Sequence, residues 1–195
     1  MKVKHLVGAF LCVLGCYACS SPKTEVQSPD GHIKMTLTVD ENGKPFYNVS
    51  VDDSLLIENS AMGFTAANGI ILSEGFQVKN TTFSSEDETW TQPWGENKKN
   101  RNHYNEMAVS LTNEDQVQLT LRFRVFDDGI GFRYEYTVPT VDSLLITNEL
   151  TTFRFHRDGT SWSIPASAET YELLYQQQPI SEVETANTPF TFKTA

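Results

Sequence analysis

The sequence predicts an all-β fold, a large antiparallel β-sandwich, on three observations. Apolar and polar residues alternate along several segments, as they do in strands that bury one face. Turn signals separate these segments, and no window sustains the periodicity of an amphipathic helix. The 195 residues suit one domain and are too few for a complete (β/α)8 barrel with anything added, since such barrels need about 250 residues.

The first segment, residues 1–18, is predicted to be an export signal. Lys2 and Lys4 precede an uncharged apolar run from Leu6 to Leu14. This run is too short to span a bilayer as a mature helix, which needs about 20 apolar residues.

All three cysteines lie in or beside this signal, so the rest of the chain has no disulfide framework, thiol nucleophile or Cys-ligated zinc site. Their placement predicts lipidation at Cys19, with Cys16 as the alternative, because Ala18 and Gly15 each supply the small residue that precedes an acylated Cys. Plain cleavage without a lipid remains open.

Residues 19–29 are polar and turn-rich and are predicted to be a linker. The whole chain carries 25 Asp and Glu against 15 Lys and Arg, a formal net charge of -10. This acidic balance argues against nucleic-acid binding, which needs a basic face, and leaves neutral or cationic partners.

Two hairpins carry the clearest strand patterns. Residues 33–39 alternate and end at a turn over residues 40–44, whose Asn-Gly pair tolerates positive φ, and a return strand begins at Phe46. The strongest alternation, from Val117 to Val125, is followed by a turn at 127–129 and a strand through Phe132, Tyr134 and Tyr136. Further strands are expected near residues 62–66, 76–81, 107–111, 150–155 and 190–192.

The most unusual stretch, residues 86–106, is predicted to be a long loop that binds sugar or meets another domain. Aromatic faces beside amides and carboxylates suit a sugar, whose C–H faces stack on rings while its hydroxyls form hydrogen bonds. An alternative is that both Trp residues only anchor the loop, with Arg101 and Glu106 paired on its surface. The candidate contact residues are Trp90, Trp94, Arg101, Asn102, His103, Tyr104 and Glu106.

Other candidates are weaker. Asp127-Asp128 before Gly129 suits a turn, and Glu182 and Glu184 are expected to share one face of a solvated strand edge. No metal ligands are assigned, because His32, His103 and His156 are too scattered for a spacing-based site. The sequence has neither a Gly-rich phosphate loop nor a Gly-x-Ser-x-Gly nucleophile elbow.

Several separated motifs, taken in order, carry a family resemblance. They are Ser28-Pro29-Asp30-Gly31, the segment from Asp87 to Gly95, the segment from Arg101 to Glu106, the hairpin from Phe123 to Tyr134, and Thr188-Pro189-Phe190-Thr191. From about Ser28 to its last residue, the chain resembles the N-terminal domain of glycoside hydrolase family 97.

This resemblance implies a β-supersandwich of the galactose-mutarotase type, here residues 30–195, that packs on a (β/α)8 barrel. The family comprises exported, calcium-dependent α-glucosidases and α-galactosidases whose catalytic carboxylates lie in the barrel. The chain alone is therefore expected to be truncated before the barrel, incomplete at its C-terminal end and catalytically inactive.

The same resemblance implies the partners, cofactor and location. The partners are an α-glucoside or α-galactoside and the catalytic barrel, and the location is the periplasm or outer membrane of a Gram-negative bacterium. The family's calcium-ligating Glu in this domain follows the Thr-Pro-Phe-Thr segment beyond Ala195, so this chain is expected to hold no cofactor. Two alternatives stay open: a free-standing carbohydrate-binding lipoprotein, and a structural domain whose loop only meets a partner.

Overall fold

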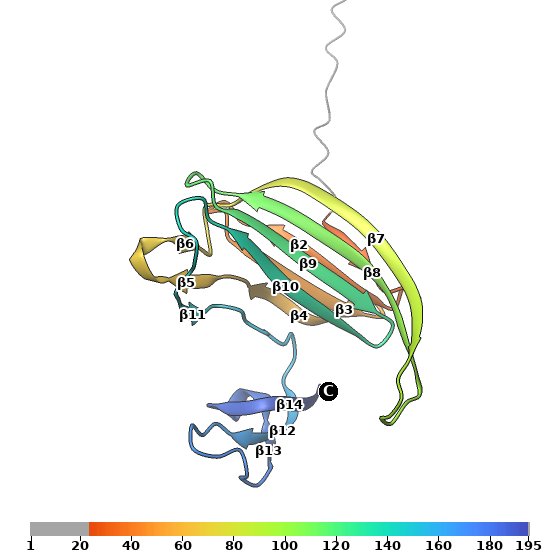
Figure 1. Cartoon of the computed structure of the whole chain (residues 1–195). Coiled ribbons are helices and arrows are strands. Elements are labelled where there is room, and N and C mark those ends of the chain that lie inside the picture. The colour runs from red at the N-terminus through yellow and green to blue at the C-terminus, as the bar shows by residue number, and fades with distance from the viewer. Residues whose placement is uncertain (1–23, 195) are drawn as a thin grey trace, which may run out of the picture.

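The computed structural model describes residues 24–194, which form strands, connecting segments and two single turns of 3-10 helix (Figure 1). The predicted export signal and both candidate lipidation sites, Cys16 and Cys19, lie outside the described residues. Within residues 24–194, no helix is long and apolar enough to cross a membrane. The predicted all-β fold is confirmed.

Two four-stranded antiparallel sheets form the sandwich (Figure 1). The first runs in the order β1-β2-β3-β4 and the second in the order β10-β9-β8-β7. The strands of the first are β1 (Glu25–Gln27), β2 (Ile33–Val39), β3 (Pro45–Val51) and β4 (Ser54–Ala61). Those of the second are β7 (Gln77–Thr91), β8 (Lys99–Thr112), β9 (Gln118–Phe126) and β10 (Gly129–Thr137).

The core lies between these sheets and follows the alternation seen in the sequence. Met35 and Leu37 of β2 are buried, as are Leu119, Leu121 and Phe123 of β9. One cluster of buried side chains contains residues from both sheets. Both predicted hairpins are confirmed, because β2 pairs with β3 and β9 with β10.

The N-terminal end of the sandwich corrects the predicted linker, residues 19–29. Residues 25–27 form β1 and pair with β2, and Ser28 is buried. The hydroxyl of Ser28 accepts a hydrogen bond from the backbone N–H of Ile33 (2.9 Å) and donates one to Asp30 (2.6 Å). The polar residues here satisfy a tight turn inside the domain, which is why they resemble a linker in the sequence.

Two three-stranded sheets complete the fold. One joins β11 (Ile146–Glu149), β5 (Phe64–Ala66) and β6 (Ile71–Leu72), and η1 (Ala67–Gly69) follows β5. The other, in the order β13-β12-β14, lies beyond the sandwich (Figure 1). It comprises β12 (Gly159–Pro165), β13 (Gln176–Pro179) and β14 (Ala186–Thr194), with η2 (Ile180–Glu182) before β14.

The prediction of a strand at residues 150–155 is wrong, although this segment runs alongside β4. Ile57 and Phe155 form an isolated bridge, and single backbone hydrogen bonds, such as Glu58 N to Arg154 O (2.8 Å), join the segment to β4 without a continuous ladder. Side-chain hydroxyls replace part of the ladder, since Thr152 Oγ1 accepts from Ala61 N (2.7 Å) and Ser60 Oγ accepts from Arg154 N (2.8 Å). Local hydroxyl bonds of this kind compete with regular strand pairing.

The strand expected to carry Glu182 and Glu184 is also wrong. Glu182 ends η2, and Glu184 lies in the irregular segment before β14. The two glutamates therefore do not share a strand face, although they alternate in the sequence.

Candidate functional site

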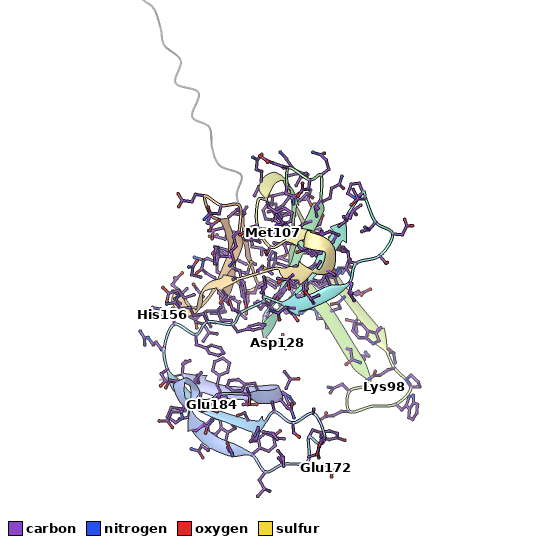
Figure 2. The ribbon with its side chains drawn as sticks, turned by 90° about the vertical axis from the view of Figure 1, so that its left-hand side faces the viewer. Lys98, Met107, Asp128, His156, Glu172 and Glu184 are labelled. Atoms are coloured by element: carbon purple, nitrogen blue, oxygen red, sulfur yellow. The ribbon has the colours of Figure 1, made fainter. Side chains whose placement is uncertain are left out.

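The seven predicted contact residues lie on or beside one long hairpin, formed by β7 and β8. These strands pair from Gln77 and Thr112 out to Thr91 and Lys99. Because β9 pairs with β8 only as far as Tyr104, the outer part of the hairpin projects from the sandwich as a two-stranded arm (Figure 1). Lys98 marks its tip and Met107 its base in the sandwich (Figure 2).

This hairpin overturns the prediction of a loop over residues 86–106. Only residues 92–98 form the connection, and the flanking residues are paired strand. Most side chains of the arm are exposed on both faces, so the arm lacks the apolar alternation that identifies a half-buried strand.

The strand geometry divides the predicted residues between two faces. Successive side chains of a strand point to opposite faces, whereas directly paired residues share one. Buried Met107 and Val109 define the inner, core-facing side of β8. Arg101 and His103 have the same parity and lie on the inner face. Asn102, Tyr104 and Glu106 lie on the outer face together with Trp90, which pairs with Asn100.

On the inner face, Arg101 makes a two-pronged ion pair with Asp87. Its Nε and Nη2 donate to the two carboxylate oxygens at 2.7 and 2.8 Å. The hydrogen bond from Arg101 lowers the pKa of Asp87. The predicted surface pair of Arg101 with Glu106 is therefore wrong, because the two side chains lie on opposite faces and each has other partners.

On the outer face, Glu106 is the centre of a charge network. Its carboxylate accepts from Arg122 Nη1 at 2.5 Å and from Arg124 Nε at 2.8 Å. Burial raises the pKa of Glu106, but the hydrogen bonds from Arg124 and Arg122 outweigh this effect and leave the pKa lowered. Arg122 also donates to Glu135 on β10, so the network ties three strands together.

The remaining outer-face residues have separate roles. The guanidinium of Arg124 stacks over the ring of Tyr104, 4.4 Å from its centroid, and Tyr104 also packs against Phe126. The side chain of Asn102 donates to Glu88 at 2.9 Å. Tyr104 and Glu106 therefore have structural partners within the sheet.

The two Trp residues of the arm are exposed. Trp94, in the connection, keeps 85% of its surface in solvent, and Trp90 keeps 50%. They do not anchor the arm to the sandwich, so that alternative is wrong for the described structure. An exposed aromatic pair on a projecting hairpin is instead available for a partner.

The turn after β9 joins the two main sheets, because it contacts the turn between β1 and β2. Asp127 Oδ1 accepts the backbone N–H of Asp30 at 2.9 Å, and its other oxygen lies 3.6 Å from His103 Nδ1. The sequence predicts mainly turn chemistry for Asp127, and the structure shows that it also holds the Ser28–Gly31 turn. The sequence carried no signal for this contact, because 97 residues separate the two aspartates.

His32 beside this turn provides a pH prediction. The side-chain hydrogen bond with Asp52 raises the pKa of His32 above 6.5, with a smaller contribution from the charges of Asp52 and Asp30. The pair should therefore stabilise the fold below the unfolded-state pKa and lose this effect as the pH rises through the folded-state pKa. NMR titration should give a raised His32 pKa that returns toward 6.5 in Asp52→Asn. An equal pKa in both proteins would contradict the pairing.

A calcium ion bound by residues 24–194 would need a ligand set of clustered oxygen donors. Among residues 24–194, no three His, Cys, Asp or Glu side chains lie close enough together to hold a metal ion. The described residues therefore do not fit a calcium site by themselves, and no role is assigned to calcium in this chain.

Comparison with known proteins identifies relatives of this fold. The model of the glycosyl-hydrolase 97 N-terminal family matches residues 26–195. A retaining α-galactosidase of Bacteroides thetaiotaomicron is 28% identical over 133 residues, which are 68% of this chain and 19% of the relative.

Solved structures of glycoside hydrolases are also similar to this chain. A glycoside hydrolase family 97 enzyme of Pseudoalteromonas sp. strain K8, solved with panose and with acarbose, is 36% identical with a TM-score of 0.80. The match covers 87% of this chain and 26% of that enzyme. A β-arabinopyranosidase is 25% identical with a TM-score of 0.68, over 78% of this chain and 26% of its own.

The chain thus spans between a fifth and about a quarter of the length of these relatives. The family match covers the whole sandwich, the arm and the three-stranded sheet beyond them. The chain belongs to the N-terminal domain family of glycoside hydrolase family 97.

Proposed function

We propose that this chain is the non-catalytic N-terminal domain of an exported α-glycosidase and that it docks on a catalytic (β/α)8 domain. The substrate class of the whole enzyme would be an α-glucoside or α-galactoside. The relatives support this proposal, since they are glycoside hydrolases and this chain corresponds to a small share of each. The proposed location is the periplasm or outer membrane, with a lipid on Cys19.

The observation that carries the docking proposal is the distribution of exposed apolar side chains. The arm presents Trp90 and Trp94, and the segment between β12 and β13 presents Tyr171, Leu174 and Tyr175. Leu174 keeps 89% of its surface in solvent. Large exposed apolar side chains of this kind are typical of interaction sites.

The arm and the β12–β14 sheet project beyond the sandwich on the same side in both views (Figures 1 and 2). Figure 2 shows Lys98, at the tip of the arm, and Glu172, in the apolar segment, both on that side. A second domain could contact both projections at once, and we propose the catalytic domain as that partner.

The docking can be measured by titrating this chain into the catalytic portion of the Pseudoalteromonas enzyme produced without its N-terminal domain. We expect saturable association that Trp94→Ala and Leu174→Ala each weaken about tenfold, as for buried anchors of an interface. Asp115→Ala, an exposed change in the turn at the opposite end of β8, is the matched control and should bind normally. Failure to associate, or equal binding by all variants, would contradict this docking surface.

A further inference from the structure

A groove of about 700 Å³ opens between the free edges of the two main sheets. β1 is one edge strand of the first sheet and β7 is one edge strand of the second. The groove lies at the base of the arm, several residue pairs from its tip. Its walls include Glu25, Gln27 and Asp30 on one side and Phe83, Ser85 and Asn105 on the other.

The pairing register of β7 and β8 determines where Phe83, Ser85 and Asn105, the second wall of the groove, lie. Phe83 pairs with buried Met107, so it lies on the inner face at the point where the core ends. The next pair on this face, Ser85 with Asn105, lies beyond the core. Phe83 keeps 51% of its surface in solvent, which is unusual for an aromatic ring beside a fully buried core residue.

The polar groups of the groove are held in place by the fold. Asn105 Nδ2 donates to the backbone oxygen of Gln27 at 2.9 Å, which joins the two walls. The opposite wall is fixed where Asp30 accepts from the Ser28 hydroxyl and donates its N–H to Asp127. Such preorganisation reduces the entropy lost on binding.

The chemistry of the walls selects a class of ligand. A half-exposed ring offers a stacking surface for a sugar, and hydroxyl, amide and carboxylate groups beside it match sugar hydroxyls. The groove is lined by Glu25, Asp30 and Glu106 and by no Lys or Arg, so an anionic ligand would be repelled. These features favour a neutral oligosaccharide.

An extended peptide added to the β7 edge is the competing occupant. The edge carries Glu86, Asp87 and Glu88 in succession, and its register shifts between Val78 and Asn80. Consecutive charges and a bulge are features that protect an edge strand against pairing with another strand. The β7 edge is therefore poorly suited to pairing with a peptide strand. A sugar does not need backbone pairing, because the side chains of the groove would hold it.

We propose that this groove is a binding site for a short neutral oligosaccharide, with Phe83 as the stacking platform and Asn105 and Ser85 as hydrogen-bonding groups. The site goes beyond the proposed docking function and uses neither Trp94 nor Leu174. It would hold glycan on the N-terminal domain, away from the surfaces that meet the catalytic domain.

Calorimetric or NMR titration of the full 195-residue chain with maltotriose and with panose tests this site. We expect saturable binding that Phe83→Ala weakens at least about tenfold and Asn105→Ala about fivefold, while Phe83→Tyr retains it. Trp94→Ala is the matched control for an exposed aromatic residue and should leave sugar binding unchanged. Circular dichroism establishes that each variant is folded.

The following results would overturn the proposal. They are absence of binding at about 10 mM of either sugar, binding that Phe83→Ala and Asn105→Ala leave intact, and binding lost in Trp94→Ala. Binding of an extended peptide in place of the sugars would also contradict it. Phe83→Ala and Asn105→Ala test sugar binding, whereas Trp94→Ala and Leu174→Ala test docking, so failure of the groove leaves the docking proposal standing, and the reverse holds as well.

Discussion

Replacing Glu106 by Ala should lower the free energy of unfolding by about 2 kcal/mol. The carboxylate is 9% exposed and accepts from both Arg122 and Arg124. Its removal leaves two guanidinium groups side by side without the charge that they share, and Arg122, which is 27% exposed, keeps only Glu135 as a partner within residues 24–194. Urea denaturation followed by circular dichroism measures the loss.

The exposed pair of Arg101 with Asp87 is the matched control for Glu106. It has comparable geometry, with distances of 2.7 and 2.8 Å, but both side chains are more than half exposed. Exposed ion pairs of this kind contribute little to stability, because water screens the two charges. Asp87→Ala should therefore change stability little. Equal losses in the two variants would show that burial does not determine the strength of the Glu106 network.

The pH dependence of stability provides a second readout of the same network. The pKa of Glu106 is lowered from 4.5 in the folded state, so the folded protein holds this proton less tightly than the unfolded chain. The contribution of Glu106 is then complete above pH 4.5 and is lost as the pH falls through the folded-state pKa. Glu106→Ala should lose less stability over this acidic range than the parent protein.

The sequence pattern identifies the strands that bury one face. It does not identify the strands that lack this alternation. Residues 117–125 alternate strictly because β9 packs one side against the core. β4 (Ser54–Ala61) has no such pattern, since its pairing with β3 shifts register twice and Asn59 has a positive φ of 44°. Each irregularity changes which side chains face the core, so period-two counting fails there.

The candidate residues of the arm were predicted as one site because they are close in sequence. In a strand, adjacent residues point apart, so Arg101 and His103 are separated from Asn102, Tyr104 and Glu106. A prediction of β8 as a strand would also have predicted that these residues divide between its two faces. The partners of Glu106 depend on the register between β8 and β9, which pairs Glu106 with Arg124, and local sequence patterns do not encode that register.

Gly43→Ala should destabilise the fold by at least about 3 kcal/mol, because strain in the left-handed region adds to displacement of packed backbone. Gly43 has a φ of +75°, and an added Cβ would overlap Phe76 N and lie 2.6 Å from Gly75 C. Two backbone hydrogen bonds hold this approach, from Gly75 N to Asn42 O (2.8 Å) and from Phe76 N to Gly43 O (3.0 Å). Phe76 belongs to the core, so moving its backbone disturbs core packing.

Gly31→Ala separates the close approach at Gly43 from conformational strain alone. Gly31 has a similar φ of +82°, but an added Cβ would meet nothing within 4 Å. It should therefore cost only about 1 kcal/mol, the penalty of placing Ala in the left-handed region. The difference between the two variants, measured by thermal or urea unfolding, is the contribution of the contact between the β2–β3 turn and Gly75-Phe76. A Gly43→Ala protein no less stable than Gly31→Ala would mean that this contact does not hold the turn against the core.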